Sequence, residues 1–242
     1  MLDQTLQYGD TLIDYRVIFV ASKRQRIAIH VHPDGTVQVD APAQTPLAEI
    51  KHAVGRRAHW LNGQIERVKI QNTHVLPREY VSGESHLYLG RRYLLKVQRN
   101  SNDNPGVMLR GGQLQVSCTQ ANPETVKSLL WHWYRSHASE FFNKRIDNLC
   151  TELHWIEQKP SWKLLKMKRQ WGNCSPKGIL SLNPHLIKAP TDCIDYVLLH
   201  ELCHLIHHNH GTAFYRLLRN HMPNWEAVKC RLDGMAAILL NE

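Results

Sequence analysis

The strongest constraint on the fold is a long apolar stripe at helical spacing that begins directly after Asn122. Asn122 suits the N-cap of a helix, and Pro123 suits the first helical position. The apolar positions that follow recur every three or four residues: Val126, Leu129, Leu130, Trp133, Tyr134, Phe141, Phe142, Ile146 and Leu149. This spacing predicts a helix of about seven turns with one buried face.

The residues before this helix alternate between apolar and polar side chains in short runs, which is typical of strands. Ile27–Val31 and Thr36–Asp40 flank the turn sequence His32-Pro33-Asp34-Gly35 and predict a hairpin. Residues 86–98 and 106–118 predict two more hairpins, with turns at Gly90 and at Gly111-Gly112. One helix is expected between the first hairpin and the second. Thr45 is its expected cap, Pro46 takes its first position, and apolar residues follow from Ile50 to Val68.

The residues after 152 predict a small sheet and further helices. Short strands are expected at 162–169 and 178–182, and helices from Asp192 to His208, from Thr212 to His221 and from about Trp225. We therefore predict an α+β fold with a change of character near residue 120. Residues 1–120 are expected to form a strand-rich region with one helix, and residues 121–242 a helical domain with a small sheet.

Composition excludes several classes of protein. The chain has 242 residues, of which 43% are hydrophobic and 21% charged, and this is ordinary for a globular protein. No apolar run reaches the roughly 18 residues that a membrane-spanning helix needs. The six cysteines form no C-x-x-C pair, and the first ten residues lack a basic stretch. We therefore expect a cytoplasmic protein with reduced thiols and no membrane partner.

The charge balance raises the question of an anionic partner. The formal net charge is +9, and 11 of the 15 basic residues before position 120 are arginines. Arginine is the better residue for bidentate contacts with phosphate. An excess of this size is also compatible with an ordinary solvated surface, so nucleic acid is expected only as an alternative partner.

His200-Glu201-Leu202-Cys203-His204 is the most informative short motif. Residues four apart lie on one face of a helix, so both imidazoles can reach the same zinc ion. Glu201 projects about 100° further round the helix, where it can reach a water beside the ion without binding the metal. The apolar residues around the motif predict the buried helix that this arrangement needs.

A catalytic zinc site takes three protein ligands and keeps one position open. We expect His210 as the third ligand, because Asn209 tolerates the left-handed backbone that would turn the chain back toward the metal. The alternative ligands are His207, His208 and, less favoured, Glu226. Exposed histidines that interact with the dipole at the end of the helix are the explanation that involves no metal. The expected cofactor is one Zn²⁺ ion, or another divalent metal, on His200, His204 and His210.

Lys168–Ser175, with the sequence KRQWGNCS, is a second informative segment. A strand edge here would pair with an extended peptide. We expect Arg169, Trp171 and Asn173 to contact the substrate. Cys174 is a candidate nucleophile or metal ligand, but neither it nor Cys203 has a partner at a metal-binding spacing. Small buried thiols are the alternative for both.

Several tracts combine into a pattern that covers nearly the whole chain. They are Trp171–Ser175, Leu182-Asn183, Pro190, Ile194–Val197, the histidine motif, Asn209-His210, Phe214, Ser22–Arg24, Asp34-Gly35, Val39–Pro42 and Trp60. This pattern resembles the YgjP-like family of metallopeptidases. The resemblance implies a zincin-like catalytic domain behind an N-terminal α+β region, zinc on the three histidines and Glu201 as general base. Asn173 departs from the serine that is usual in the family, and His207 stands where metzincins place a turn glycine.

The expected activity is metal-assisted hydrolysis of peptide bonds. Zinc lowers the pKa of a bound water toward about 7, and Glu201 would accept the proton of that water as it attacks. The resemblance also implies two alternatives. Some family members are described as UTP pyrophosphatases, and the histidine motif is similar to that of SprT-like proteases, which act on DNA-bound proteins. The expected substrate is therefore a polypeptide or a nucleotide.

Overall fold

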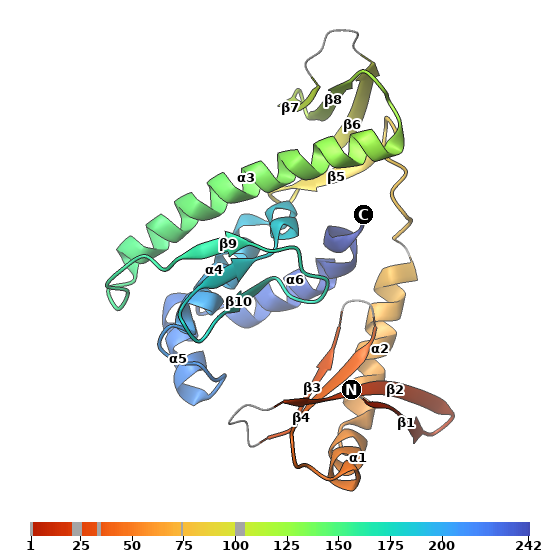
Figure 1. Cartoon of the computed structure of the whole chain (residues 1–242), viewed down its shortest axis with the longest axis vertical. Coiled ribbons are helices and arrows are strands. Elements are labelled where there is room, and N and C mark those ends of the chain that lie inside the picture. Colours follow the sequence, from red (N-terminus) through yellow and green to blue (C-terminus); the bar gives the residue numbers. More distant parts are fainter. Residues whose placement is uncertain (1, 21–25, 33–34, 74, 100–104) are drawn as a thin grey trace. The chain divides into compact units, whose positions relative to one another are not determined.

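The computed structural model describes the whole chain except residues 1, 21–25, 33–34, 74 and 100–104. The chain divides into two compact units, Met1–Leu76 and Pro77–Glu242. Both contain helices and strands (Figure 1), so the predicted α+β class is confirmed.

The first unit is a four-stranded sheet with two helices. Its strands are β1 (Leu2–Tyr8), β2 (Thr11–Val20), β3 (Ala28–Val31) and β4 (Val37–Pro42), in the order β1-β2-β4-β3. The predicted hairpin is confirmed as the antiparallel pair β3–β4, although its turn residues Pro33 and Asp34 lie outside the described residues. The helices are α1 (Leu47–Gly55) and α2 (Ala58–Thr73).

The prediction of one helix in this region, capped by Thr45, was wrong in its details. The structure places Pro46 at the N-cap of α1, with extended backbone and no side-chain cap. The helix is interrupted at Arg56-Arg57, directly after Gly55. Glycine is among the least favourable residues inside a helix, which accounts for a break at this point. Apolar side chains on α1, α2 and the inner face of the sheet form a separate core, with Val17, Val39, Ile50, Val54 and Leu61 fully buried.

The second unit begins with another four-stranded sheet. Its strands are β5 (Ser85–Tyr88), β6 (Arg91–Arg99), β7 (Gly106–Arg110) and β8 (Gln113–Cys118), in the order β5-β6-β8-β7. The two predicted hairpins are confirmed as β5–β6 and β7–β8. A side chain at Gly90 would place its Cβ 2.8 Å from the Cα of Pro190, so only glycine fits at this turn.

Helix α3 (Pro123–Glu152) is the long helix that the apolar stripe predicts (Figure 1). The Asn122 side chain caps it by accepting a hydrogen bond from the backbone N–H of Thr125 at 2.8 Å. The buried face of α3 packs on β7, β8 and the helical elements that follow it. The sheet β5–β8 therefore shares one core with the C-terminal half of the chain, and Leu95, Leu114 and Val116 belong to it. For this reason the compact units divide after Leu76 and not near residue 120.

The remaining elements hold the predicted site. A three-stranded sheet contains β9 (Trp162–Leu164), β10 (Gly172–Cys174) and β11 (Leu180–Leu182), in the order β10-β11-β9. The 3-10 helix η1 (Pro184–Lys188) leads into α4 (Thr191–Cys203), which is followed by α5 (Thr212–His221) and α6 (Trp225–Leu240). Helix α4 ends at Cys203, five residues before the predicted His208, because the backbone turns at His204–His207.

Among the described residues, no helix combines the length and the apolar character that crossing a bilayer requires.

Candidate metal centre and active site

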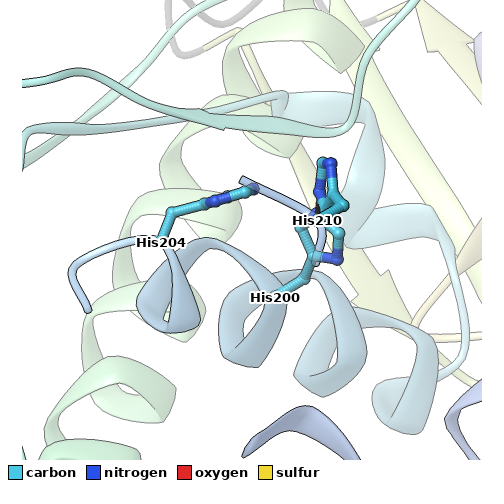
Figure 2. Close-up of side chains that lie close together, drawn as sticks. All are labelled: His200, His204 and His210. Atoms are coloured by element: carbon cyan, nitrogen blue, oxygen red, sulfur yellow. Dashed lines mark hydrogen bonds between the residues drawn. The ribbon is translucent and has the colours of Figure 1, made fainter. Parts of the chain in front are cut away.

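Three histidine rings meet at the end of helix α4. His200 lies in the last turn of α4, His204 is its C-cap, and His210 stands in the loop before α5. The candidate ligand atoms of the three side chains all lie within 4.8 Å of one another. Figure 2 shows the three rings directed into the same space, with His200 and His204 on the helix and His210 on a separate segment of the chain above it. The structure thus brings together the three residues predicted as ligands.

Hydrogen bonding fixes which nitrogen of His204 faces this space. Its Nδ1 is 3.0 Å from the carbonyl oxygen of His207. A carbonyl only accepts, so Nδ1 carries the proton and the neutral ring keeps its lone pair on Nε2. The backbone turn that ends α4 early therefore supplies an orienting contact, which is the role of a neighbouring carbonyl around many metal-binding histidines.

His200 is held in a different way. Its Nε2 lies 2.9 Å from Nε2 of His210. Its Nδ1 is buried, and no group of the described residues lies within hydrogen-bonding distance of it. The ring packs instead against Tyr196 and Phe214, with centroid distances of 5.9 and 4.9 Å. Aromatic packing and the contact of Nε2 with His210 therefore set the orientation of this ring, without a hydrogen bond at Nδ1.

The electrostatic environment favours neutral histidines. Burial, and then the neighbouring His210 and His204, lower the pKa of His200 to about 3. Burial also lowers the pKa of His204. Neutral imidazole is the form that binds a metal, and three imidazole nitrogens are a donor set that suits zinc. The residues present therefore fit a divalent metal ion of the zinc type.

Phe214 supports the three histidines from one side. Its ring centroid lies 4.9 Å from that of His200 and 4.7 Å from those of His204 and His210. Phe214 is fully buried in α5. Sequence reasoning did not assign it a role in the site, although its position four residues after His210 on an amphipathic helix was a signal for it.

Glu201 lies in α4 with 5% of its surface exposed, and it packs against strand β10. A Cβ added at Gly172 would stand 2.8 Å from Oε1 of Glu201 and 2.7 Å from its Cγ. Only glycine therefore lets the β10 backbone approach the carboxyl group this closely. Burial raises the pKa of Glu201 to about 8, whereas a cation nearby would favour its ionised form.

The residues predicted to contact substrate lie in strand β10 and in the loop before it. Asn173 is exposed and pairs with Ser181 in the middle of β10. Alternate residues of a strand point to opposite faces, so Asn173 faces away from the side on which Gly172 meets Glu201. Trp171 packs against the main core, and its carbonyl accepts the N–H of Asn183 at 2.8 Å. Arg169 lies in the loop between β9 and β10.

The other candidate ligands lie outside the histidine cluster. Glu226 is exposed in α6 and forms an ion pair with Arg219 at 3.1 Å. His207 contributes its backbone carbonyl to His204. Among the described residues, the group that could hold a metal contains neither His207, His208 nor Glu226.

Comparison with known proteins assigns the chain to a class. Residues 25–235 match the family model described as YgjP-like, metallopeptidase domain, so the chain is a metallohydrolase of the metallopeptidase type. The chain belongs to the YgjP-like family.

Two solved structures are similar to part of the chain. The metallopeptidase zymogen of Pyrococcus abyssi abylysin is 19% identical, with a TM-score of 0.35 over 38% of this chain and 90% of that chain. The metallopeptidase zymogen of Methanocaldococcus jannaschii jannalysin is 22% identical, with a TM-score of 0.34 over 38% of this chain and 92% of that chain. A search of curated proteins found no match.

Proposed function

We propose that the protein is a zinc-dependent peptidase, with His200, His204 and His210 as metal ligands and Glu201 as general base. The observation that carries this proposal is the convergence of the three rings at the helix turn that also holds a buried carboxyl group. A structural zinc site has no need of that carboxyl group. A bound zinc ion would supply Lewis-acid activation of a water and of the scissile carbonyl.

The place of Glu201 on α4, directly after His200, supports the role of general base. Its carboxylate would accept a proton from the attacking water as the oxygen bonds to the carbonyl carbon. It would then donate this proton to the amine nitrogen as the carbon–nitrogen bond breaks. The close approach of Gly172 restricts the side chain of Glu201, so the proton acceptor is held in place before substrate arrives.

The place of strand β10 in its sheet supports an extended substrate. It forms the edge of the order β10-β11-β9, and its Gly172 contacts Glu201. A peptide that pairs with an edge strand presents its backbone carbonyls at regular intervals. Pairing along β10 would therefore place a scissile bond beside the general base. We infer an unfolded or extended polypeptide as the substrate class.

The test compares zinc-loaded wild type with Glu201→Gln on an unfolded, fluorescently labelled polypeptide. The variant keeps the size of the side chain but cannot accept the proton, so its rate should fall by about 10²–10⁴-fold. Zinc content, measured on the same samples, should be equal. Equal cleavage by both proteins would reject the proposal. Diphosphate release from UTP without cleavage of polypeptide would replace it with the nucleotide alternative.

A further inference from the structure

A cavity of about 310 Å³ lies within the unit Pro77–Glu242 and shares no residue with the histidine cluster. Its walls come from five segments: the residues around β5, the first half of α3, the loop after β9, η1, and the residues that follow α6. Its volume falls in the range of sites that bind small organic molecules.

Positive charge predominates on the wall of this cavity. The charged groups are Arg78, Lys127, Lys166 and Lys188 against Glu124 and Glu242. Lys188 is only 7% exposed, and its Nζ donates to the carbonyl of Leu239 at 3.0 Å. Burial, and then the charge of Arg78, lower the pKa of Lys188 to about 7. A buried cation is unfavourable unless an anion or hydrogen bonds compensate it, so this wall favours an anionic ligand.

The same wall is rich in aromatic rings. Three lysines each stand over one of them: Lys127 over Tyr80 at 5.6 Å, Lys166 over Trp131 at 5.0 Å and Lys188 over Tyr134 at 5.2 Å from the ring centroid. Such contacts hold an ammonium group and a ring side by side. A ligand that carries both a negative charge and a flat apolar body therefore finds complementary groups for each part.

A carboxylate of the chain itself already contacts two basic side chains of this cavity. The carboxylate of Glu242 lies with one oxygen 2.6 Å from Nζ of Lys166 and the other 2.7 Å from Nε2 of His185. The side chain of His185 is only 3% exposed. A buried imidazole and a lysine thus form a carboxylate subsite, in which Glu242 is the internal occupant.

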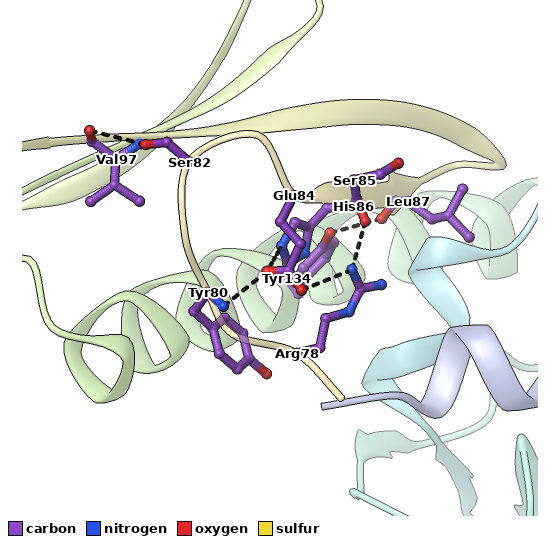
Figure 3. Close-up of polar contacts among 9 residues, drawn as sticks. All are labelled: Arg78, Tyr80, Ser82, Glu84, Ser85, His86, Leu87, Val97 and Tyr134. Atoms are coloured by element: carbon purple, nitrogen blue, oxygen red, sulfur yellow. Dashed lines mark hydrogen bonds and ion pairs between the residues drawn. The ribbon is translucent and has the colours of Figure 1, made fainter. Parts of the chain in front are cut away.

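The wall around β5 is held by its own polar contacts (Figure 3). Nη1 of Arg78 donates to the carbonyl of Ser85 at 2.6 Å and lies 3.5 Å from a carboxylate oxygen of Glu84. The other oxygen of Glu84 accepts the backbone N–H of Tyr80 at 2.9 Å. The hydroxyl of Tyr134 donates to the carbonyl of Leu87 at 2.8 Å. These residues are positioned before any ligand binds, which lowers the entropic cost of binding.

We propose that this cavity is a second ligand site, which binds an aromatic carboxylic acid. Its ring lies among Tyr80, Trp131 and Tyr134, and its carboxylate replaces that of Glu242 at Lys166 and His185. Glu242 therefore acts as an internal competitor. The proposal rests on the cavity alone and is independent of the proposed peptidase activity.

The test measures binding of 2-naphthoate to the full-length, zinc-loaded protein by isothermal titration calorimetry. The uncharged analogue 2-naphthamide has the same ring but lacks the negative charge, so we expect it to bind at least about tenfold more weakly.

Glu242→Gln removes the competing charge and should tighten naphthoate binding about tenfold. Lys166→Met should weaken it about tenfold. Both positions are partly exposed, with 24% and 51% of the side chain accessible, so these variants should fold. Lys177→Met is the matched control, because Lys177 is exposed and lies outside the cavity lining. It should leave the affinity for naphthoate unchanged.

The histidine cluster is itself a site where a carboxylate could bind through the metal. The titration is therefore repeated after a chelator has removed the zinc, and binding of naphthoate to the cavity should stay unchanged. Loss of all naphthoate binding on removal of the zinc, equal affinity for naphthoate and naphthamide, or no response to both cavity variants would overturn the proposal.

Discussion

The contact between Gly172 and Glu201 shows how strongly the candidate site depends on single residues. The β10 backbone and the carboxyl group are so close that a methyl group at position 172 would lie 2.8 Å from Oε1. Because this distance is far below van der Waals contact, either the strand or the glutamate would have to move. The position of the proposed general base is thus fixed by a residue that has no side chain.

We predict that Gly172→Ala lowers the rate of peptide cleavage by about 10²-fold, since a displacement of about 1 Å at a catalytic group has an effect of this order. It should also reduce the free energy of unfolding by about 1–3 kcal/mol. Activity assays and urea denaturation measure the two effects. Gly106→Ala is the matched control, because a Cβ there meets nothing within 4 Å. Full activity in Gly172→Ala would show that the close contact does not position Glu201.

The histidines of the loop after α4 offer a second comparison at this scale. His210 belongs to the cluster of candidate ligands, whereas the nearby His208 does not. We predict that His210→Ala weakens zinc binding at least about 100-fold, because loss of a direct ligand has a larger effect than loss of a supporting contact. His208→Ala should leave the zinc affinity unchanged, because His208 is outside the cluster of candidate ligands. Competition with a chromophoric chelator measures both affinities. The assignment of His210 as ligand is wrong if the two variants bind zinc equally well.

At the scale of elements, helix α4 is tied to α3 by one bidentate ion pair. Nε and Nη2 of Arg145 each donate to an oxygen of Asp195 at 2.7 Å. These side chains are 31% and 18% exposed, so water screens the pair only in part. The hydrogen bond to Asp195 also raises the pKa of Arg145. This pair joins the long helix to the helix that carries the histidine motif.

We predict that Arg145→Lys destabilises the protein by about 1–2 kcal/mol, because lysine cannot make the two parallel hydrogen bonds. The exposed pair Lys229–Asp233 within α6 supplies the control, and Lys229→Met should cost at most about 0.5 kcal/mol. Urea denaturation compares the two variants. Similar losses of stability would mean that the ion pair between α3 and α4 contributes no more to the free energy of unfolding than an exposed surface pair.

Local signals predicted an element well where its formation depends on one segment of the chain. Asn122 and Pro123 identified the start of α3, because capping depends on neighbouring residues only. The spacing of His200 and His204 placed them on one helix face for the same reason. The end of α4 was not predicted, since it depends on the turn that follows. The approach of β10 to Glu201 was not predictable either, because it joins segments almost thirty residues apart.

At the scale of the whole molecule, the division into units could not be deduced from the secondary-structure pattern. Strands β5–β8 look like a continuation of the strand-rich region, yet their apolar faces share a core with α3 and the elements that follow. Which core a strand joins depends on packing between distant segments. The same holds for the cavity, whose walls come from five parts of the chain. Nucleic acid as a partner stays a prediction.

Buried neutral histidines should make the whole molecule sensitive to acid. Burial, and then the charge of Arg78, lower the pKa of His86 to about 4, below its ordinary value of 6.5. The unfolded state therefore binds more protons between these values, so stability that is present above pH 6.5 is lost as the pH falls toward 4. This histidine alone contributes a slope of up to about 1.4 kcal/mol per pH unit.

We predict that His86→Asn reduces the slope of the free energy of unfolding against pH between about 6.5 and 4. The reduction should correspond to at most about one fewer proton taken up on unfolding. Denaturation with urea at a series of pH values gives the slope. His132→Asn, on the exposed side of α3, should leave the slope as in wild type. An unchanged slope in His86→Asn would contradict the burial of a neutral His86.

The central claim is that three histidines hold one metal ion beside a glutamate that does not bind it. Anomalous diffraction at the zinc absorption edge, from crystals of the zinc-loaded protein, tests this claim most directly. We predict one peak bound by His200, His204 and His210, with the carboxyl group of Glu201 facing the open side of the ion. A peak at another place, or a fourth protein ligand that closes the site, would contradict the account.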